Sequence, residues 1–205
     1  MEKESQLLDN VRSIFMRYGI KSVTMDDIAR ELKISKKTLY QFVVDKPELV
    51  SKVMQFKCNC DQTDVTDIIK KSKNAVDELL NVTQYFGKII REIHPSIHYD
   101  LEKYYPEAWQ VFDQHKKGFV LNCITTNLKR GIKEGLYRDN LNVDIIARIF
   151  VARIDMVFDS EIFPPSQFNF GEVHLELMRY HIRGIASEKG IKYLLDKLKN
   201  EKIKF

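Results

Sequence analysis

The chain has 205 residues, of which 30% are charged and 44% are hydrophobic, and its formal net charge is only +4. This composition is typical of a globular protein with a buried core, and it excludes a polycation that binds nucleic acid through overall charge. Any DNA binding must therefore come from a local patch. The polar N-terminus does not resemble a signal peptide, and no apolar run approaches the roughly 18 residues of a membrane span. We therefore expect a cytoplasmic protein with no membrane partner.

The three cysteines, Cys58, Cys60 and Cys123, are odd in number. We expect free thiols, as in a reduced compartment. A zinc site is the alternative, but no fourth ligand stands at a suitable spacing. The sequence therefore predicts neither a metal nor a cofactor.

Helical periodicity begins near the N-terminus. Val11, Ile14, Phe15 and Tyr18 recur on one face, which predicts a helix from about Ser5 to Tyr18. Gly19 ends it, because glycine adopts the left-handed conformation without steric cost.

Two short helices follow. Thr24 is a predicted N-cap, with Asp27 three residues later as in a capping box. Ser35 caps a third helix, which we expect to run from Lys36 to about Val43 and to bury Leu39. Asp45 caps a fourth helix that extends into the 60s, where the polar stretch 61–66 is a possible bend.

The remaining elements also read as helices, and strand signals are almost absent. Proline and glycine separate the predicted segments. We expect these helices at about 75–93, 96–105, 106–134, 143–158, 171–187 and 191–202, with the longest connection at about 159–170.

The segment 33–44 carries three lysines and no acidic residue. A helix that reads the major groove needs small or basic side chains at its start and flanks that hold phosphates. Lys36, Lys37 and Gln41 are predicted to face outward, where lysine can donate to guanine and glutamine can pair with adenine. The predicted phosphate contacts are Thr24, Thr38, Tyr40 and Lys46.

Other interpretations of these residues remain open. A lysine run is most often a solvated helix face, and a helix-turn-helix also occurs as a packing unit. The joint pattern of caps, spacing and an acid-free stretch favours DNA binding over either of these.

Residues 7–49 resemble the DNA-binding domain of TetR-type transcriptional regulators. At the turn, Leu32 and Lys33 stand where that family often has Ala-Gly. The phrase GIKEGLYRDNLNVDIIA (131–147) is also similar to a stretch seen before that family's dimer helices. The matching residues in the first region are Phe15, Gly19, Thr24, Asp27, Ile28, Ala29, Ile34, Ser35, Lys36, Thr38, Leu39, Tyr40, Lys46, Glu48 and Leu49.

The resemblance implies an all-α fold. A three-helix DNA-binding domain (1–50) would precede a larger helical domain (51–205) that dimerises and binds a small lipophilic effector. The implied function is a repressor that binds a palindromic operator as a homodimer and is released by the effector.

The residues of the larger domain are compatible with that implication. The segments 143–158 and 171–187 are apolar on most faces and so need cover on two sides, which a dimer supplies; central helices of a monomer are the alternative. Arg153 and Asp155 in this setting suggest paired charges. Seven aromatic residues of the middle region are predicted to line the effector pocket, and a plain hydrophobic core is the alternative for each. They are Tyr85, Phe86, Tyr99, Tyr105, Trp109, Phe112 and Phe119.

Two other classes of function are alternatives for this sequence. A helical enzyme or binding module with an incidental helix-turn-helix is disfavoured, because no phosphate-binding glycine loop, nucleophile elbow or metalloprotease motif is present. A nucleoid protein would be more broadly basic. The sequence therefore predicts a transcriptional regulator that is not an enzyme.

Overall fold

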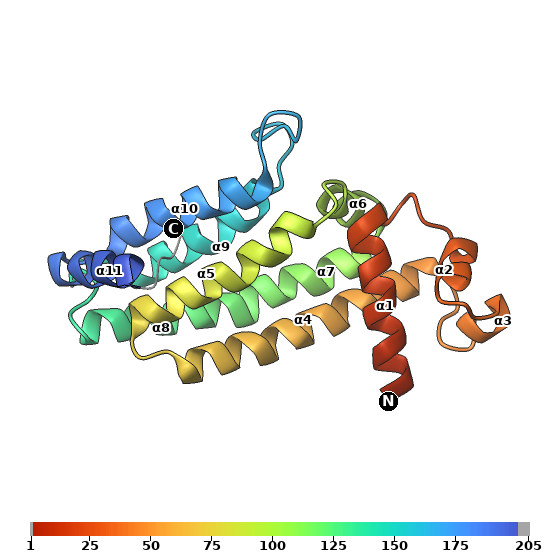
Figure 1. Cartoon of the computed structure of the whole chain (residues 1–205), viewed down its shortest axis with the longest axis horizontal. Helices are drawn as coiled ribbons and strands as arrows, with labels where there is room; N and C mark the ends of the chain where they lie inside the picture. Colours follow the sequence, from red (N-terminus) through yellow and green to blue (C-terminus); the bar gives the residue numbers. More distant parts are fainter. Residues whose placement is uncertain (1, 201–205) are drawn as a thin grey trace. The chain divides into compact units, whose positions relative to one another are not determined.

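The computed structural model describes residues 2–200, and within that range the secondary structure is helical, as predicted. Figure 1 shows the helices in chain order. Their bounds are α1 Glu2–Tyr18, α2 Met25–Glu31, α3 Lys36–Leu39, α4 Lys46–Lys71, α5 Ala75–Glu92, α6 Ile97–Tyr104, α7 Pro106–His115, the π-helical turn Lys116–Val120, α8 Leu121–Lys133, α9 Val143–Val157, α10 Phe170–Ile185 and α11 Glu188–Asn200.

The contacts divide the chain into two compact units, residues 2–64 with 92–116 and residues 65–91 with 117–200. The long helix α4 therefore begins in the first unit and ends in the second. These two units are defined by contacts alone. The division into a DNA-binding domain (1–50) and an effector-binding domain (51–205) is a division by function, and it remains a prediction.

The first unit is built on one apolar cluster. Val11, Ile28 and Leu39, from α1, α2 and α3, are each fully buried. Leu49 and Val50 of α4 and Leu101 of α6 belong to the same cluster. The short helices α2 and α3 are thus held against α1 by a common core rather than by their own hydrogen bonds.

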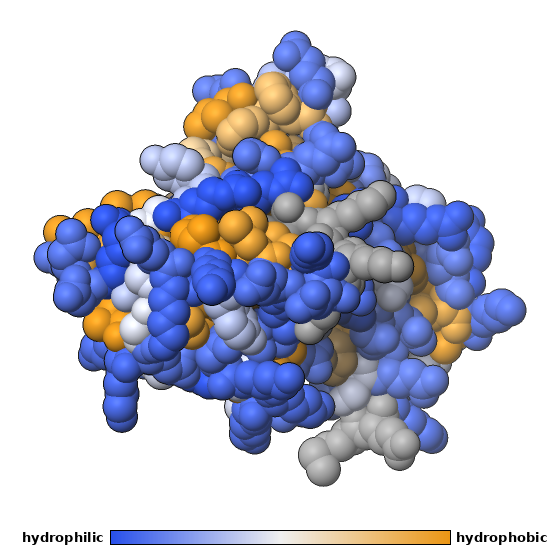
Figure 2. Space-filling view, turned by 60° about the vertical axis from the view of Figure 1, so that its left-hand side comes forward, coloured by the Kyte–Doolittle hydropathy of each residue, from blue (hydrophilic) through white to orange (hydrophobic). Residues whose placement is uncertain are grey.

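The second unit packs α5, α8, α9, α10 and α11 around a separate apolar cluster. Figure 1 shows α9 and α10 side by side, joined by a segment that projects beyond the helices. Figure 2 shows apolar colour on that projection, where Ile162 and Phe168 are exposed. The predicted long connection at 159–170 is therefore present.

The stretch between α8 and α9 is fixed by close contacts. A Cβ atom at Gly131 would lie 2.0 Å from the ring of Tyr137, so only glycine fits there. Arg138 N donates to Ile185 O at 2.9 Å, and Ser187 N donates to Leu136 O at 2.9 Å. These bonds join the end of α8 to the junction of α10 and α11.

Some predicted boundaries were wrong. The third helix ends at Leu39 rather than near Val43, and the helix predicted from 106 to 134 is interrupted by the π-helical turn Lys116–Val120. The polar stretch 61–66 does not interrupt α4. The predicted end of the last helix, at residue 202, lies outside the described residues.

Candidate nucleic-acid interface

The start of α2 is fixed by its predicted cap. Asp27 N donates to Thr24 Oγ1 at 3.1 Å, and Thr24 N donates to Asp27 Oδ2 at 3.0 Å. Hydrogen bonds from Thr24 hold the pKa of the Asp27 carboxyl below its usual value. This confirms the capping box, and it leaves Thr24 exposed at the N-terminal end of α2.

The turn between α2 and α3 contains a strained residue. Lys33 has φ +54°, in the left-handed region that glycine adopts more readily. Lys33 is also exposed, so its ammonium adds charge beside α3. TetR-type domains often have Ala-Gly at this turn, with the glycine at the position of Lys33. Glycine adopts this positive φ without strain.

Helix α3 is short and anchored at both ends. Thr38 N donates to Ser35 Oγ at 3.0 Å at its start, and Leu39 is fully buried at its end. The chain then continues as a tighter turn, in which Gln41 N donates to Thr38 O at 3.2 Å. Gln41 therefore lies in the turn after α3 rather than within the helix.

Four of the predicted DNA contacts are exposed on α3 or in the turn that follows it: Lys36, Lys37, Tyr40 and Gln41. We call these four residues the exposed α3 surface. The side chains of Lys37 and Gln41 have no hydrogen-bond or ion-pair partner among the described residues. Lys36 Nζ pairs with Asp26 Oδ1 at 2.5 Å, with both side chains more than half exposed. An ion pair this exposed is worth about 0–1 kcal/mol, so it does not prevent Lys36 from turning to a base.

The side chain of Lys46 is directed into the protein. Its Nζ donates to Ile20 O at 2.7 Å, and the ammonium lies 5.7 Å from the centre of the Tyr105 ring. Burial lowers the pKa of Lys46, while the carboxylates of Asp100 and Asp27 act in the opposite direction. The phosphate contact expected of Lys46 remains a prediction. In the structure, its hydrogen bond to Ile20 O also stabilises the α1–α2 turn.

Asp100 of α6 is a residue of this region that the sequence did not indicate. Its Oδ2 accepts from Ile20 N at 3.1 Å, from Lys21 N at 3.0 Å and from Ser96 Oγ at 3.0 Å. Asp100 is buried, so these bonds fix the α1–α2 turn against α6. Residues 20 and 100 are 80 positions apart, and no local spacing rule could have paired them.

Two aromatic residues of the predicted effector pocket, Trp109 and Phe112, lie together in the first unit. The ring of His98 stands edge-on to Trp109, at 4.9 Å between centroids. Lys116, at the start of the π-helical turn, is buried with its Nζ 5.0 Å from the Trp109 ring centre and 4.9 Å from that of Phe112. π-Helical turns are often found at functional sites.

The other predicted pocket residues are dispersed. Tyr99 is 51% exposed and Tyr105 is buried, both in the first unit. Tyr85, Phe86 and Phe119 belong to the second unit, where the rings of Tyr85 and Phe86 stand edge to face at 5.0 Å. The assignment of all seven residues to one pocket remains a prediction.

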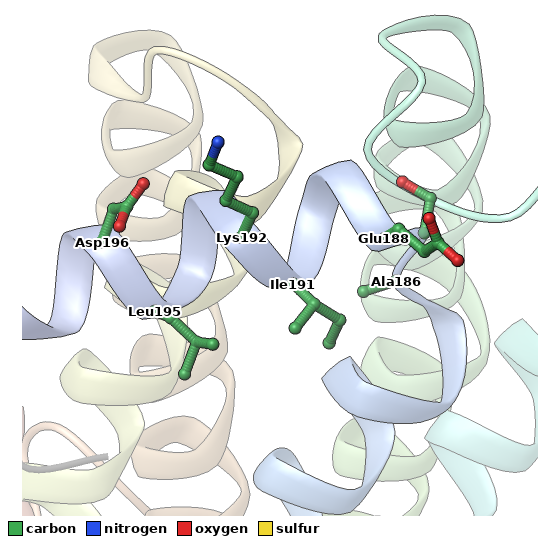
Figure 3. Close-up of a pocket in the computed structure, with 7 residues that line it drawn as sticks. Ala186, Glu188, Ile191, Lys192, Leu195 and Asp196 are labelled. Carbon is green, nitrogen blue, oxygen red and sulfur yellow. The ribbon is translucent and has the colours of Figure 1, made fainter.

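A shallow groove of about 450 Å³ runs along α11. Figure 3 shows Ile191 and Leu195 pointing to one side of the helix and Lys192 and Asp196 to the other. None of the predicted pocket aromatics lines this groove.

The described residues include no group of three His, Cys, Asp or Glu side chains that could hold a metal ion. Within the same range, no helix has the length and apolar character needed to cross a membrane. Cys58, Cys60 and Cys123 are free thiols.

Comparison with known proteins points to one family. Residues 7–53 match the model of the family "Bacterial regulatory proteins, tetR family". The HTH-type transcriptional regulator YvaF of Bacillus subtilis is 26% identical over 169 residues, covering 82% of this chain and 88% of YvaF. The HTH-type transcriptional repressor KstR2 of Mycobacterium tuberculosis is 22% identical over 153 residues, covering 71% of this chain and 74% of KstR2.

A solved structure shows the same fold. The transcriptional regulator FadR of Bacillus subtilis, crystallised with stearoyl-CoA, matches with a TM-score of 0.68 at 17% identity. The match covers 88% of this chain and 98% of that protein.

Proposed function

Because this chain is a DNA-binding transcriptional regulator of the TetR type and not an enzyme, we propose that it is a repressor that binds a palindromic operator as a homodimer and is released by a small lipophilic effector. The observation that carries this proposal is the exposed surface of Lys36, Lys37, Tyr40 and Gln41, held on a short helix by the buried Leu39.

The geometry of that surface suits the major groove. Lys37 and Gln41 are exposed and, within residues 2–200, make no hydrogen bond or ion pair that a base would have to displace. Lysine donates to guanine O6 and N7, and glutamine pairs with adenine N6 and N7. Thr24, Thr38 and Tyr40 are then proposed as phosphate contacts that set the register.

Dimerisation through α9 and α10 is supported by apolar side chains on their surface. Ile145 and Ile149 of α9 are 52% and 58% exposed, and Tyr180 of α10 is 81% exposed. Ile145 and Ile149 lie one helical turn apart, and exposed apolar side chains that lie together favour a protein interface. A two-fold dimer would present two copies of α3 to half-sites one helical turn apart, roughly 34–36 Å.

Release by an effector needs a mechanical connection to the DNA-binding helices. We propose that α4 is this connection, because it continues from the N-terminal helices into the second unit. Within the first unit, Asp100 of α6 fixes the α1–α2 turn. An effector would shift the population away from DNA binding by its differential affinity for the two states. The stearoyl-CoA bound by FadR is the precedent for a lipophilic effector.

A titration of genomic DNA fragments tests the proposal. We expect one palindromic site to bind far more tightly than other fragments, with an affinity that falls steeply with salt. Gln41→Ala should change the preference at one base pair per half-site by about 1–3 kcal/mol. Lys37→Ala should cost affinity for that site in the same titration.

The matched control is Gln110→Ala, which removes an exposed glutamine from α7. It should leave both affinity and preference unchanged. Equal binding to all fragments, with no effect of Gln41→Ala, would overturn the proposal and favour a nonspecific nucleoid protein.

A further inference from the structure

The side chain of Arg153 on α9 has an unusual set of partners. Its Nη1 donates to Leu177 O at 2.9 Å, and its Nη2 donates to Met178 Sδ at 2.7 Å. The guanidinium carbon lies 3.8 Å from the centre of the Phe150 ring. A thioether is a weak acceptor, so one arm of this guanidinium is poorly satisfied.

The expected pairing of Arg153 with Asp155 is wrong. Across residues 2–200, no carboxylate forms an ion pair with the Arg153 guanidinium. Burial lowers the pKa of Arg153 to about 10, a value at which the group still carries its charge near neutral pH. A partly buried positive charge without a counter-ion is costly, which suggests that a binding partner completes it.

Two histidines of α10 lie close to this guanidinium and its Phe150 partner. His181 packs edge-on against the Phe150 ring at 4.9 Å, and His174 Nε2 lies 3.4 Å from Thr83 O of α5. Burial and the nearby Arg153 charge lower the pKa of His174 to about 4 and of His181 to about 3. Both imidazoles are therefore neutral near pH 7, and they can accept or donate hydrogen bonds beside the guanidinium.

Space is available next to these residues. Gly87 of α5 is buried, yet a methyl group added there would meet only one atom of the described residues within 4 Å, His174 Cδ2 at 3.9 Å. A buried position in a close-packed interior usually touches several neighbours. There is therefore room for additional side-chain or ligand atoms at Gly87, on the side of α5 that faces His174.

We propose that Arg153 binds the anionic headgroup of the effector, a carboxylate or a phosphate, with the apolar part of the ligand in the space beside Gly87. This inference rests on the proposed effector response and specifies its chemistry. A carboxylate or phosphate would replace the Met178 sulfur with a charge-assisted, bidentate partner for the guanidinium. Phe150 and Met178 then provide apolar surface close to the headgroup.

Calorimetry on the full chain without DNA tests the proposal. The probes are octanoate, laurate and stearate, the alkyl phosphates of the same chain lengths, and the neutral alcohols of the same chain lengths, all below their micellar concentrations. We expect at least one anion to bind about ten-fold or more tightly than its alcohol, because only the anion makes charge-assisted hydrogen bonds to the guanidinium. The carboxylate and phosphate arms identify which headgroup is preferred.

Four variants separate the roles. Arg153→Gln should weaken binding of that anion about ten-fold or more and leave the alcohol unaffected, and Arg153→Lys should recover part of the loss. Lys88→Gln, an equal charge change on the exposed face of α5, is the control for general electrostatics. Gly87→Leu should abolish binding by filling the space, whereas the smaller Gly87→Ala should be tolerated, because its methyl makes only an ordinary contact.

Operator binding is measured separately, so that the two proposals fail in different ways. Operator binding with no anion preferred over its alcohol would overturn the Arg153 site and leave the regulator intact. Anion binding that is as tight in Arg153→Gln as in the wild type would also overturn the site. Loss of specific operator binding in the wild type would overturn the repressor, while the calorimetry would still decide the role of Arg153.

Discussion

Two arginines of the second unit, Arg130 and Arg153, are both partly buried but have opposite surroundings. Arg130 Nη1 binds Glu78 Oε2 at 3.1 Å, its Nε binds Glu134 Oε1 at 2.7 Å, and its Nη2 donates to Ser72 O at 3.2 Å. Arg153 instead contacts a carbonyl, a sulfur and an aromatic ring.

Arg130 is paired with carboxylates and stabilises the fold, whereas the proposal above assigns the Arg153 charge to a ligand. Around Arg130 the polar groups satisfy one another: Ala75 N donates to Glu134 Oε2 at 2.8 Å, and Asn127 Nδ2 donates to Ala75 O at 3.0 Å. Tyr137 donates from its hydroxyl to the same carbonyl at 3.0 Å. This network joins the start of α5 to α8. The Arg153 guanidinium makes no comparable connection between acidic and basic groups.

The largest expected effect comes from breaking the Arg130 network. Arg130→Met leaves the buried Glu78 carboxylate without its cation, and burial already raises the pKa of Glu78. Removing one partner of a buried pair costs about 3–5 kcal/mol, and we expect about 2–4 kcal/mol here because Arg130 is partly solvated. Urea unfolding at fixed protein concentration measures the loss.

The control for Arg130→Met is Lys70→Met, which removes an exposed cation 3.9 Å from Asp67 on α4. That exposed pair should contribute less than about 1 kcal/mol. If the two variants lost equal stability, the Arg130 network would be no more structural than a surface ion pair.

Mild acid should act mainly on the Arg153 neighbourhood. Burial lowers the pKa of His174 to about 4 and that of His181 to about 3 in the folded protein, below the ordinary histidine value of 6.5. The unfolded chain therefore binds more protons, so stability is complete above about pH 6.5 and falls as the pH drops. Each histidine contributes at most about 1.4 kcal/mol per pH unit, and partial solvation reduces the expected loss from pH 6.5 to 5 to about 2 kcal/mol.

Unfolding of the double variant His174→Gln/His181→Gln at both pH values checks this assignment. The variant should lose clearly less stability than the wild type over the same interval. Glu78 acts in the opposite direction, because a raised carboxyl pKa favours folding as the pH falls. An identical decline in the wild type and the double variant would place the acid sensitivity elsewhere in the molecule.

The sequence predicted the features that depend on neighbouring residues. The caps at Thr24 and Ser35, the stop at Gly19 and the burial of Leu39 are all present in the structure. Each follows from a spacing of four residues or fewer, or from the repeat of one helical face. This is why the helix-turn-helix could be recognised from the sequence.

The features that the sequence missed depend on distant residues. Asp100 binds Ile20, and Arg130 binds Glu78, across 80 and 52 positions of the chain. The end of α3 was also misplaced, because Phe42 N bonds to Leu39 O in a tighter turn. Periodicity alone does not distinguish that turn from a further turn of α-helix.

The smallest expected effect has the opposite sign. Arg153→Met should leave stability unchanged or raise it by about 1 kcal/mol, because a desolvated charge without a carboxylate partner is replaced by an apolar side chain of similar length. The methionine can keep contact with the Phe150 ring, so the packing of α9 against α10 is retained. Urea unfolding under the conditions used for Arg130→Met gives the direct comparison. A loss as large as that of Arg130→Met would mean that Arg153 holds the two helices together, and its charge would then be explained without a ligand.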